Sequence, residues 1–340
     1  MLLLSAIVLS ACMGAVALSP AEVLRALLHP ATAGDTGVIL FSLRLPRVLA
    51  AGLAGAGLSA TGVLFQGLFR NPLADPFVLG ASGGAALGGA VAVFLLPSLT
   101  FAGVGATELL AFAGSLLTMA VVWKLAGPGG SLGVRSATSM RSTSMRYSMQ
   151  NMLLAGFAFG TMLNAATAAL ELREETTNPG VRILEAWLHG EISAPSWTQL
   201  ALVGFVEIAL LLLALPLARQ LNPLALSEEY AAQLGVRVER LQLMVVVLGS
   251  MLTALSVSLG GLIGFVGLLV PHFLRLILGP DHFRLLPASA LGGAVFLIVA
   301  DTIARTAFAP SEIPVGMLTA FLGVPAFLYL LNRKSPSASH

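Results

Sequence analysis

Apolar residues occur along this chain in long runs separated by short polar breaks. Ten of these runs are 17 to 21 residues long, which is the length a helix needs to cross the hydrocarbon core of a bilayer. None alternates between apolar and polar residues as the strands of a membrane barrel do. The pattern predicts an all-α, polytopic transmembrane helical bundle of about ten spans, built as a single domain over residues 1–340. The ten segments are Leu2–Leu18, Val48–Leu68, Val78–Leu96, Leu109–Leu125, Met152–Leu170, Leu200–Leu217, Leu241–Leu259, Leu262–Leu278, Leu286–Ala304 and Val315–Leu331.

Two boundaries in this pattern allow more than one interpretation. Only Gly260-Gly261 separates the seventh and eighth segments, so the link is either a hairpin between two spans or a break in one long helix. Leu2–Leu18 has the length of a signal peptide, but no Lys or Arg precedes it, whereas a signal peptide begins with a positively charged region. We therefore expect Leu2–Leu18 to be a retained first span.

The composition supports a membrane protein and excludes several other classes. Hydrophobic residues make up 57% of the chain and charged residues only 10%, against about 25% charged residues in a soluble domain. Intrinsic disorder requires the opposite balance. No run of Lys and Arg indicates nucleic-acid binding, and with one cysteine and no Cys/His cluster we expect neither a disulfide nor a metal site.

The distribution of Lys and Arg predicts the orientation of the spans, because these residues favour the cytoplasmic side. If the N-terminus is cytoplasmic and the ten spans alternate, the inner ends carry 12 of the 18 Lys and Arg residues and the outer ends carry 6. An even number of spans then places the C-terminal Arg333 and Lys334 inside as well. Both termini are therefore expected to be cytoplasmic.

Three of the six cations on the predicted outer side, where the topology rule disfavours positive charge, lie next to the ends of spans. Arg44 and Arg47 precede the second segment and flank Pro46, a residue that suits the first turn of a helix. Arg305 follows the ninth segment, four residues after Asp301, so one helical turn can pair the two. The arginines indicate an acidic partner outside the membrane, unless their side chains simply extend to lipid headgroups.

The predicted inner side carries a repeated tetrad and a polar segment. Asn71-Pro72-Leu73-Ala74 recurs as Asn222-Pro223-Leu224-Ala225, and proline makes a repeated helix stop the simplest explanation. Leu224–Arg240 is the most polar long stretch on this side. Ser227, followed by two acidic residues, predicts the start of a short helix, and Gly235 predicts its end. Such a helix either covers the bundle or docks on a soluble subunit.

Six motifs in order extend this interpretation to a family. They are Leu43–Arg47, Asn71–Pro76 with Gly80–Gly84, Leu224–Arg240, Gly264–His272, Asp301–Arg305 and Glu312–Gly316. From Leu43 to the C-terminus, nearly 300 residues, the chain resembles the permease subunits of the FecCD family of ABC importers.

This resemblance implies a type II ABC importer permease fold in a bacterial inner (plasma) membrane. It implies two copies of the permease, two ATP-binding cassette ATPase subunits and a periplasmic or lipid-anchored substrate-binding protein, with no cofactor in the permease. The chain has no Gly-x-x-x-x-Gly-Lys-Ser/Thr motif, so we expect ATP hydrolysis on the separate ATPase and no catalytic residue here.

The resemblance also implies roles for particular residues. Arg44, Arg47 and Arg305 would pair with acidic residues of the binding protein. The central pathway would run beside the fifth and tenth spans, with Asn164 and Met162 as candidate residues, although a hydrogen bond between helices also explains Asn164. A coupling segment, Leu224–Val236, would contact the ATPase. Its candidate contact residues are Leu224, Ala225, Leu226, Ser227, Glu228, Glu229, Ala232, Leu234 and Gly235.

The expected function is the import of an iron chelate, either a ferric siderophore or haem. A cobalamin permease of the same family is the alternative. A different class, a secondary carrier coupled to protons, would use the ionisable residues Glu207, Asp301 or His272, since such residues within spans are functional candidates.

Overall fold

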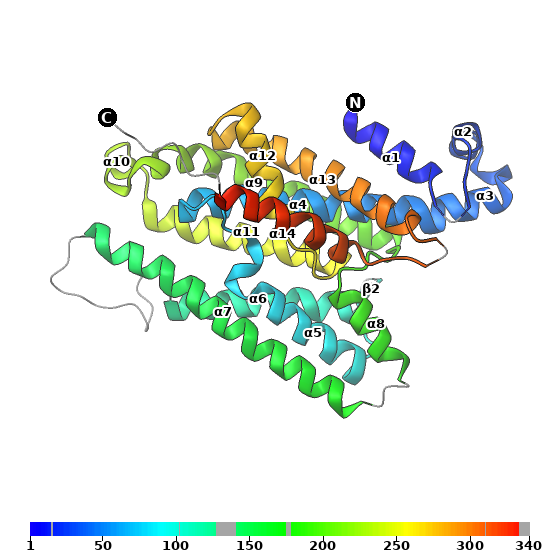
Figure 1. Cartoon of the computed structure of the whole chain (residues 1–340), viewed down its shortest axis with the longest axis horizontal. Coiled ribbons are helices and arrows are strands. Elements are labelled where there is room, and N and C mark those ends of the chain that lie inside the picture. The colour runs from blue at the N-terminus through cyan, green and yellow to red at the C-terminus, as the bar shows by residue number, and fades with distance from the viewer. Residues whose placement is uncertain (15, 102, 127–140, 175–177, 310, 333–340) are drawn as a thin grey trace.

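Helices form nearly all of the regular structure in the computed structural model (Figure 1). The structure describes the whole chain except residues 15, 102, 127–140, 175–177, 310 and 333–340, so Arg333 and Lys334 lie outside the described part. The longer helices are α1 (Leu2–Cys12), α2 (Pro20–Leu28), α4 (Leu45–Phe69), α5 (Ala81–Leu95), α6 (Ala106–Ala126), α7 (Arg141–Arg173), α8 (Pro179–Leu188), α9 (Trp197–Leu226), α11 (Val238–Gly260), α12 (Val266–Leu278), α13 (His282–Thr306) and α14 (Val315–Asn332).

Several short elements connect these helices. A two-stranded antiparallel hairpin, β1 with β2, lies between α5 and α6. The short elements are η1 (Pro30–Thr32), α3 (Gly34–Val38), η2 (Ile39–Arg44), η3 (Pro76–Leu79), β1 (Thr100–Phe101), β2 (Val104–Gly105) and α10 (Glu228–Gln233).

The predicted all-α polytopic architecture is confirmed. Within the described residues, six helices are long and apolar enough to cross a membrane, and four shorter apolar helices, α1, α5, α12 and α14, coincide with the remaining predicted segments. The six are Gly34–Phe69, Ala106–Ala126, Asn151–Arg173, Trp197–Leu226, Val238–Gly260 and His282–Thr306.

Two predicted boundaries differ from the structure. The first helix, α1, ends at Cys12 instead of Leu18, and Ser19 then caps a separate helix, α2, through a capping box with Glu22. Pro46 does not begin a new span, because α3, η2 and α4 run on as one helix from Gly34. The π-helical segment η2 ends at Arg44, two residues before Pro46, and such a local change of helical pitch accommodates the proline within the helix.

The repeated tetrad is not a repeated helix stop. At the first copy the predicted helix stop is present, since α4 ends at Phe69, just before Asn71, and Arg70 takes a left-handed conformation. At the second copy α9 continues through Pro223 to Leu226. The second tetrad therefore lies in the last turn of a helix, and Asn222 is free to make contacts with another helix.

The link at Gly260-Gly261 joins two separate helices. Gly261 has φ 69° and Phe265 has φ 68°, and two such residues redirect the chain between α11 and α12. A Cβ atom on Gly261 would lie 2.1 Å from the Trp187 carbonyl oxygen. Only glycine tolerates both the positive φ and this close approach.

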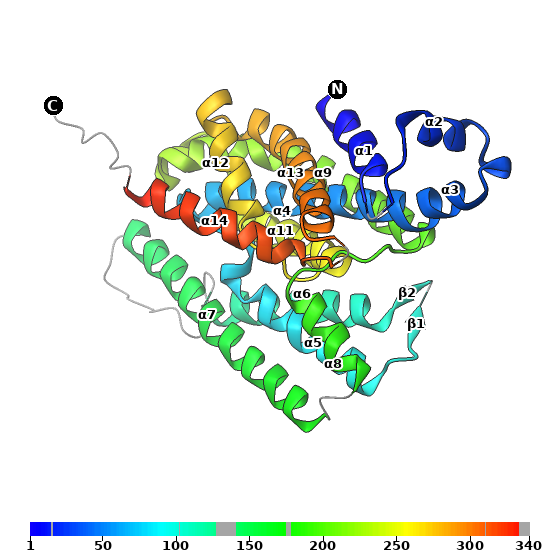
Figure 2. The ribbon, with the colours of Figure 1, turned by 45° about the vertical axis from the view of Figure 1, so that its right-hand side comes forward.

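The most deeply buried helix, α4, packs against α9, α11, α12 and α13. Glycines allow the closest contacts: a Cβ on Gly55 would lie 2.2 Å from the Gly293 carbonyl oxygen of α13, which is the small-residue packing typical of membrane helices. A second group, α5 to α8, lies to one side (Figure 2). Both α4 and α13 extend between the end that holds α10 and the end that holds α2 and α3, in opposite chain directions (Figure 1).

Candidate functional sites at the two ends of the bundle

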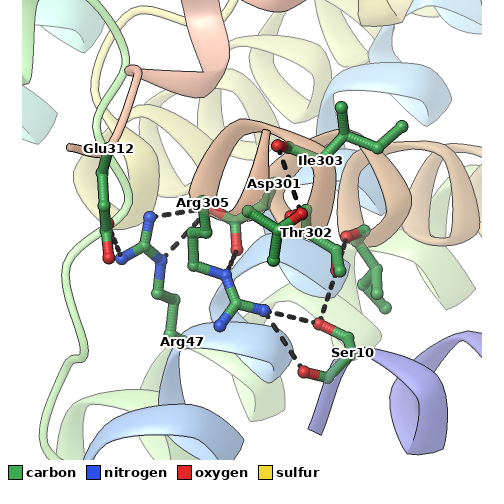
Figure 3. A network of polar contacts seen from close by, with 9 residues as sticks. Ser10, Arg47, Asp301, Thr302, Ile303, Arg305 and Glu312 are labelled. Atoms are coloured by element: carbon green, nitrogen blue, oxygen red, sulfur yellow. Dashed lines mark hydrogen bonds and ion pairs between the residues drawn. The ribbon is translucent and has the colours of Figure 1, made fainter. Parts of the chain in front are cut away.

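One end of the bundle carries a network of charged residues that we call the outer arginine cluster: Arg44, Arg47, Asp301, Arg305 and Glu312. Asp301 is at its centre and is 1% exposed. Its Oδ1 accepts hydrogen bonds from Arg47 Nε at 3.2 Å and Nη2 at 3.0 Å, and its Oδ2 lies 3.1 Å from Arg305 Nε (Figure 3). Arg47 Nη1 donates to Glu312 Oε2 at 2.7 Å. The cluster thus joins α4, α13 and the segment before α14.

The same cluster holds the C-terminal end of α1. Arg305 Nη2 donates to Ser10 Oγ at 2.8 Å, and Thr302 Oγ1 donates to the same oxygen at 2.7 Å (Figure 3). Arg44 donates to the carbonyl oxygens of Ala11, Cys12 and Val16. The last carbonyls of a helix lack partners within the helix and carry partial negative charge. The two arginines therefore satisfy the end of α1.

The structure gives the three predicted docking arginines partners within the chain. Arg44 and Arg305 are each 6% exposed, and the side chain of Arg47 is 15% exposed. The predicted pairing of Asp301 with Arg305 is confirmed. Three arginines against two carboxylates leave the cluster with a formal charge of +1.

Sequence reasoning did not anticipate Glu312 and Ser10 as members of this network. Glu312 stands in one of the six motifs, but its contact with Arg47 joins residues 265 positions apart. No local spacing signals such a pair.

The opposite end of the bundle carries the predicted coupling segment. Within it, α10 begins and ends as predicted. Ser227 caps the helix, because its Oγ accepts a hydrogen bond from the Tyr230 backbone N–H at 2.9 Å, and Gly235 follows the helix with φ 82°. Leu226, Tyr230 and Leu234 leave 73%, 44% and 60% of their surface exposed, and they give this end of the bundle an apolar surface.

One predicted contact residue differs from the others. Leu224 is 0% exposed and belongs to the hydrophobic core between helices. Its side chain therefore anchors the coupling segment to the bundle and is not available to a partner. The remaining candidates are exposed or partly exposed: Ala225, Leu226, Ser227, Glu228, Glu229, Ala232, Leu234 and Gly235.

One polar link that the sequence did not predict connects this segment to the bundle, and a second joins two helices just before the segment begins. Nη2 of Arg70, which follows α4, lies 3.3 Å from Oε1 of Glu228 in α10. Burial raises the pKa of Glu228, and Arg70 partly opposes this. Asn222, in the last turn of α9, donates to Asp281 Oδ1 at 2.7 Å, and this hydrogen bond lowers the pKa of Asp281. The repeated tetrad was the only signal in the sequence that drew attention to Asn222.

The two candidate pathway residues lie on α7. Met162 is 56% exposed and Asn164 is also exposed in the single chain. Residues two positions apart lie roughly 200° apart around a helix. A pathway along one face of α7 is therefore lined by one of them and not by both.

The three candidates for proton coupling occupy different surroundings. Asp301 is held between two arginines, Glu207 is fully buried beside Gly57 of α4, and His272 is partly buried in α12. Both carboxylate oxygens of Asp301 lie in ion pairs with Arg47 and Arg305.

The fold and its apolar helices define a polytopic α-helical membrane protein. The model of the FecCD transport family matches residues 2–333. The chain is 41% identical over 303 residues to the cobalamin import system permease protein BtuC of Halobacterium salinarum, covering 88% of this chain and 75% of that protein. It is 38% identical over 333 residues to the hemin transport system permease protein HmuU of Yersinia pestis, covering 97% and 92%.

The fold of this chain is also similar to that of a solved transporter structure. An inward-facing conformation of a putative metal-chelate type ABC transporter superposes with a TM-score of 0.78 and 29% sequence identity, covering 98% of this chain and 96% of that one. The chain belongs to the FecCD transport family. It is a multi-pass membrane permease, and the family works with ATPase and substrate-binding partners.

Proposed function

We propose that this chain is the permease subunit of an importer that carries an iron chelate, a ferric siderophore or haem, into the cytoplasm of a bacterium. The observation that supports this most directly is the match to the hemin permease of Yersinia pestis over 97% of the chain. Cobalamin is the second candidate substrate, because the cobalamin permease of Halobacterium salinarum is 41% identical.

The same proposal includes the orientation and the assembly. The end with the coupling segment faces the cytoplasm and contacts an ATPase subunit, so that two copies of the chain engage two ATPase subunits, and both termini lie on that side of the inner membrane. The end with the outer arginine cluster faces the binding protein. A second copy of the chain packs beside α7, whose exposed residues Leu154, Phe157 and Thr161 recur at helical spacing, and Asn164 or Met162 lines the pathway between the copies.

Reconstitution in proteoliposomes tests the function. The permease is combined with its ATPase and binding protein, and uptake of haem, a ferric siderophore and cobalamin is measured with and without ATP. We expect uptake that depends on ATP and on both partners. Uptake that persists without the ATPase but stops when the proton gradient is removed would establish the secondary carrier instead.

The docking role assigned to Arg44, Arg47 and Arg305 requires its own test. The excess of one positive charge attracts acidic residues, and Arg47 is the one of the three whose side chain remains most exposed. Arg47→Gln should weaken binding-protein affinity at low salt, where charge pairing is strongest. Arg25→Gln is the matched control, since Arg25 is an exposed arginine on α2. Equal affinities for both variants would remove the docking assignment.

A further inference from the structure

The end of α9 is joined to the start of α13 by a small polar network centred on Asn222. The Asn222 amide nitrogen donates to Asp281 Oδ1 at 2.7 Å. Its Oδ1 accepts from the His282 backbone N–H at 2.9 Å and lies 2.8 Å from His282 Nδ1. One side chain therefore makes three polar contacts with the first turn of another helix.

The chemistry of the partners determines how the Asn222 amide is oriented. An ionised carboxylate only accepts hydrogen bonds, so the NH₂ group must face Asp281 and the carbonyl oxygen must face His282. The imidazole then donates from Nδ1. Neither aspartate nor leucine supplies one donor and one acceptor at this position, which explains why an amide is present in the last turn of α9.

The network lies where three helices meet. His282 is 6% exposed, and a Cβ on Gly67 of α4 would lie 2.8 Å from its Nε2. Arg219 of α9 adds a second link to α13, with its guanidinium carbon 4.0 Å from the centre of the Phe283 ring. Close packing and directional hydrogen bonds together resist sliding of α9 against α13.

The Asn222 network lies between the short helix α10 and the long helix α13. Five residues after Asn222, Ser227 caps α10, the short helix of the coupling segment. In the other direction α13 extends for 25 residues, from His282 to Thr306, or roughly 37 Å, and its far end carries Asp301 and Arg305 of the outer arginine cluster.

We propose that Asn222 is a positioning residue that links the coupling segment to α13, so that movement of α10 on a docked ATPase is passed to the outer arginine cluster. This rests on the proposed function. The link from Arg70 to Glu228 connects the same segment to α4, and α4 and α13 contact each other backbone to backbone at Gly55 and Gly293. This close approach packs the two helices tightly against each other.

The test measures substrate transported per ATP hydrolysed by the reconstituted complex. Asn222→Ala should lower this ratio by about 2- to 30-fold, the range found for residues that carry coupling between sites, while binding-protein-stimulated hydrolysis continues. Asn71→Ala is the matched control, because Asn71 occupies the first copy of the tetrad and its side chain accepts a hydrogen bond from the Leu73 N–H within its own turn.

Three further variants separate coupling from folding. Asp281→Ser keeps a good N-cap for α13 but shortens the side chain that reaches Asn222, and it should lower the ratio in the same way. Asn222→Asp places two carboxylates together and should also lower it. The double variant Asn222→Asp with Asp281→Asn restores a donor between the two positions and should recover the ratio.

Three results would overturn the proposal. They are an unchanged ratio in both Asn222→Ala and Asp281→Ser, a proportional loss of transport and hydrolysis, and no recovery in the double variant. Failure of the proposed function would appear in the wild-type complex itself, as absence of ATP-dependent uptake, and would remove this inference with it.

Discussion

Buried charged residues in this chain are stabilised by partners that lie far away in the sequence. Asp301 is buried, yet it is stabilised by two arginines from α4 and α13. A buried carboxylate without such partners would be strongly unfavourable. The arginines are equally dependent on it, because Arg305 is almost fully buried.

Replacing Asp301 should therefore destabilise the protein. Asp301→Asn leaves Arg47 and Arg305 without their shared anion, and removing one partner of a buried ion pair costs about 3–5 kcal/mol. Thermal unfolding of the purified chain in detergent measures this loss. Glu312→Gln is the control, since the Glu312 side chain is 45% exposed and exposed pairs contribute at most about 1 kcal/mol. Equal losses of stability in Asp301→Asn and Glu312→Gln would contradict the central position of Asp301 in the cluster.

Asp75 should make stability depend on pH. Burial raises its pKa from 3.8 to about 6, while the hydrogen bond from the Phe77 N–H opposes the shift. The folded chain then binds this proton more tightly than the unfolded chain. The contribution of Asp75 to the free energy of unfolding therefore falls as pH rises from about 4 to about 6.

Asp75→Asn keeps the N-cap acceptor of η3 and removes the titration. The variant should melt at a higher temperature than the wild type at neutral pH, and the difference should narrow toward pH 4. Asp281→Asn is a control of opposite sign, because the pKa of Asp281 is lowered and its ionised form favours the fold at neutral pH. If the melting temperatures of wild type and Asp75→Asn changed in parallel with pH, the pH dependence would not come from Asp75.

At the scale of elements, α4 and α13 form one of the closely packed helix pairs of the bundle. The two backbones approach so closely that a Cβ on Gly55 would lie 2.2 Å from the Gly293 carbonyl oxygen, and a Cβ on Gly293 would lie 2.2 Å from the Gly55 carbonyl oxygen. No rotation of a side chain relieves a clash with backbone atoms. The contact therefore depends on glycine in both helices.

Gly55→Ala should force these helices apart and lower stability by about 1–3 kcal/mol, the usual effect of overpacking. Gly52→Ala is the matched control one turn earlier in α4, where the new Cβ would meet the flexible tip of Ile298 at 3.3 Å. Melting temperatures of both variants in detergent give the comparison. A Gly55→Ala variant as stable as Gly52→Ala would show that the contact is adaptable.

At the scale of the whole molecule, the two candidate sites lie at opposite ends of α4 and α13 (Figure 1). The outer arginine cluster holds α1, α4 and α13 at one end, and the coupling segment adjoins α9, α11 and the end of α4 at the other. Meanwhile α7 lies on the far side of α5 and α6 from this core (Figure 2). Its exposed residues are available to a second copy of the chain.

A two-fold dimer through α7 should bring Thr161 close to its own counterpart, since a two-fold interface uses the same patch on both copies. Thr161→Cys in a Cys12→Ala background should form a covalent dimer on mild oxidation in the membrane. Leu291→Cys on α13 is the control, because it is also exposed, at 58%. Equal yields at both positions would argue against α7 as the interface.

The sequence by itself determined the features that depend on neighbouring residues. Hydropathy over about 20 residues located the ten apolar helices, capping chemistry located both ends of α10, and the spacing of four residues paired Asp301 with Arg305. The ordered motifs identified the family. These signals are local, or they are read position by position along the chain.

Only the tertiary structure decided which polar groups are buried together. Arg47 and Asp301 are 254 positions apart, and Asn222 and His282 are 60 apart. Their contacts exist because α4, α9 and α13 pack side by side, which no local pattern specifies. The same packing turned three predicted surface cations into a paired cluster, because a guanidinium buried among helices must find its hydrogen-bond acceptors within the chain.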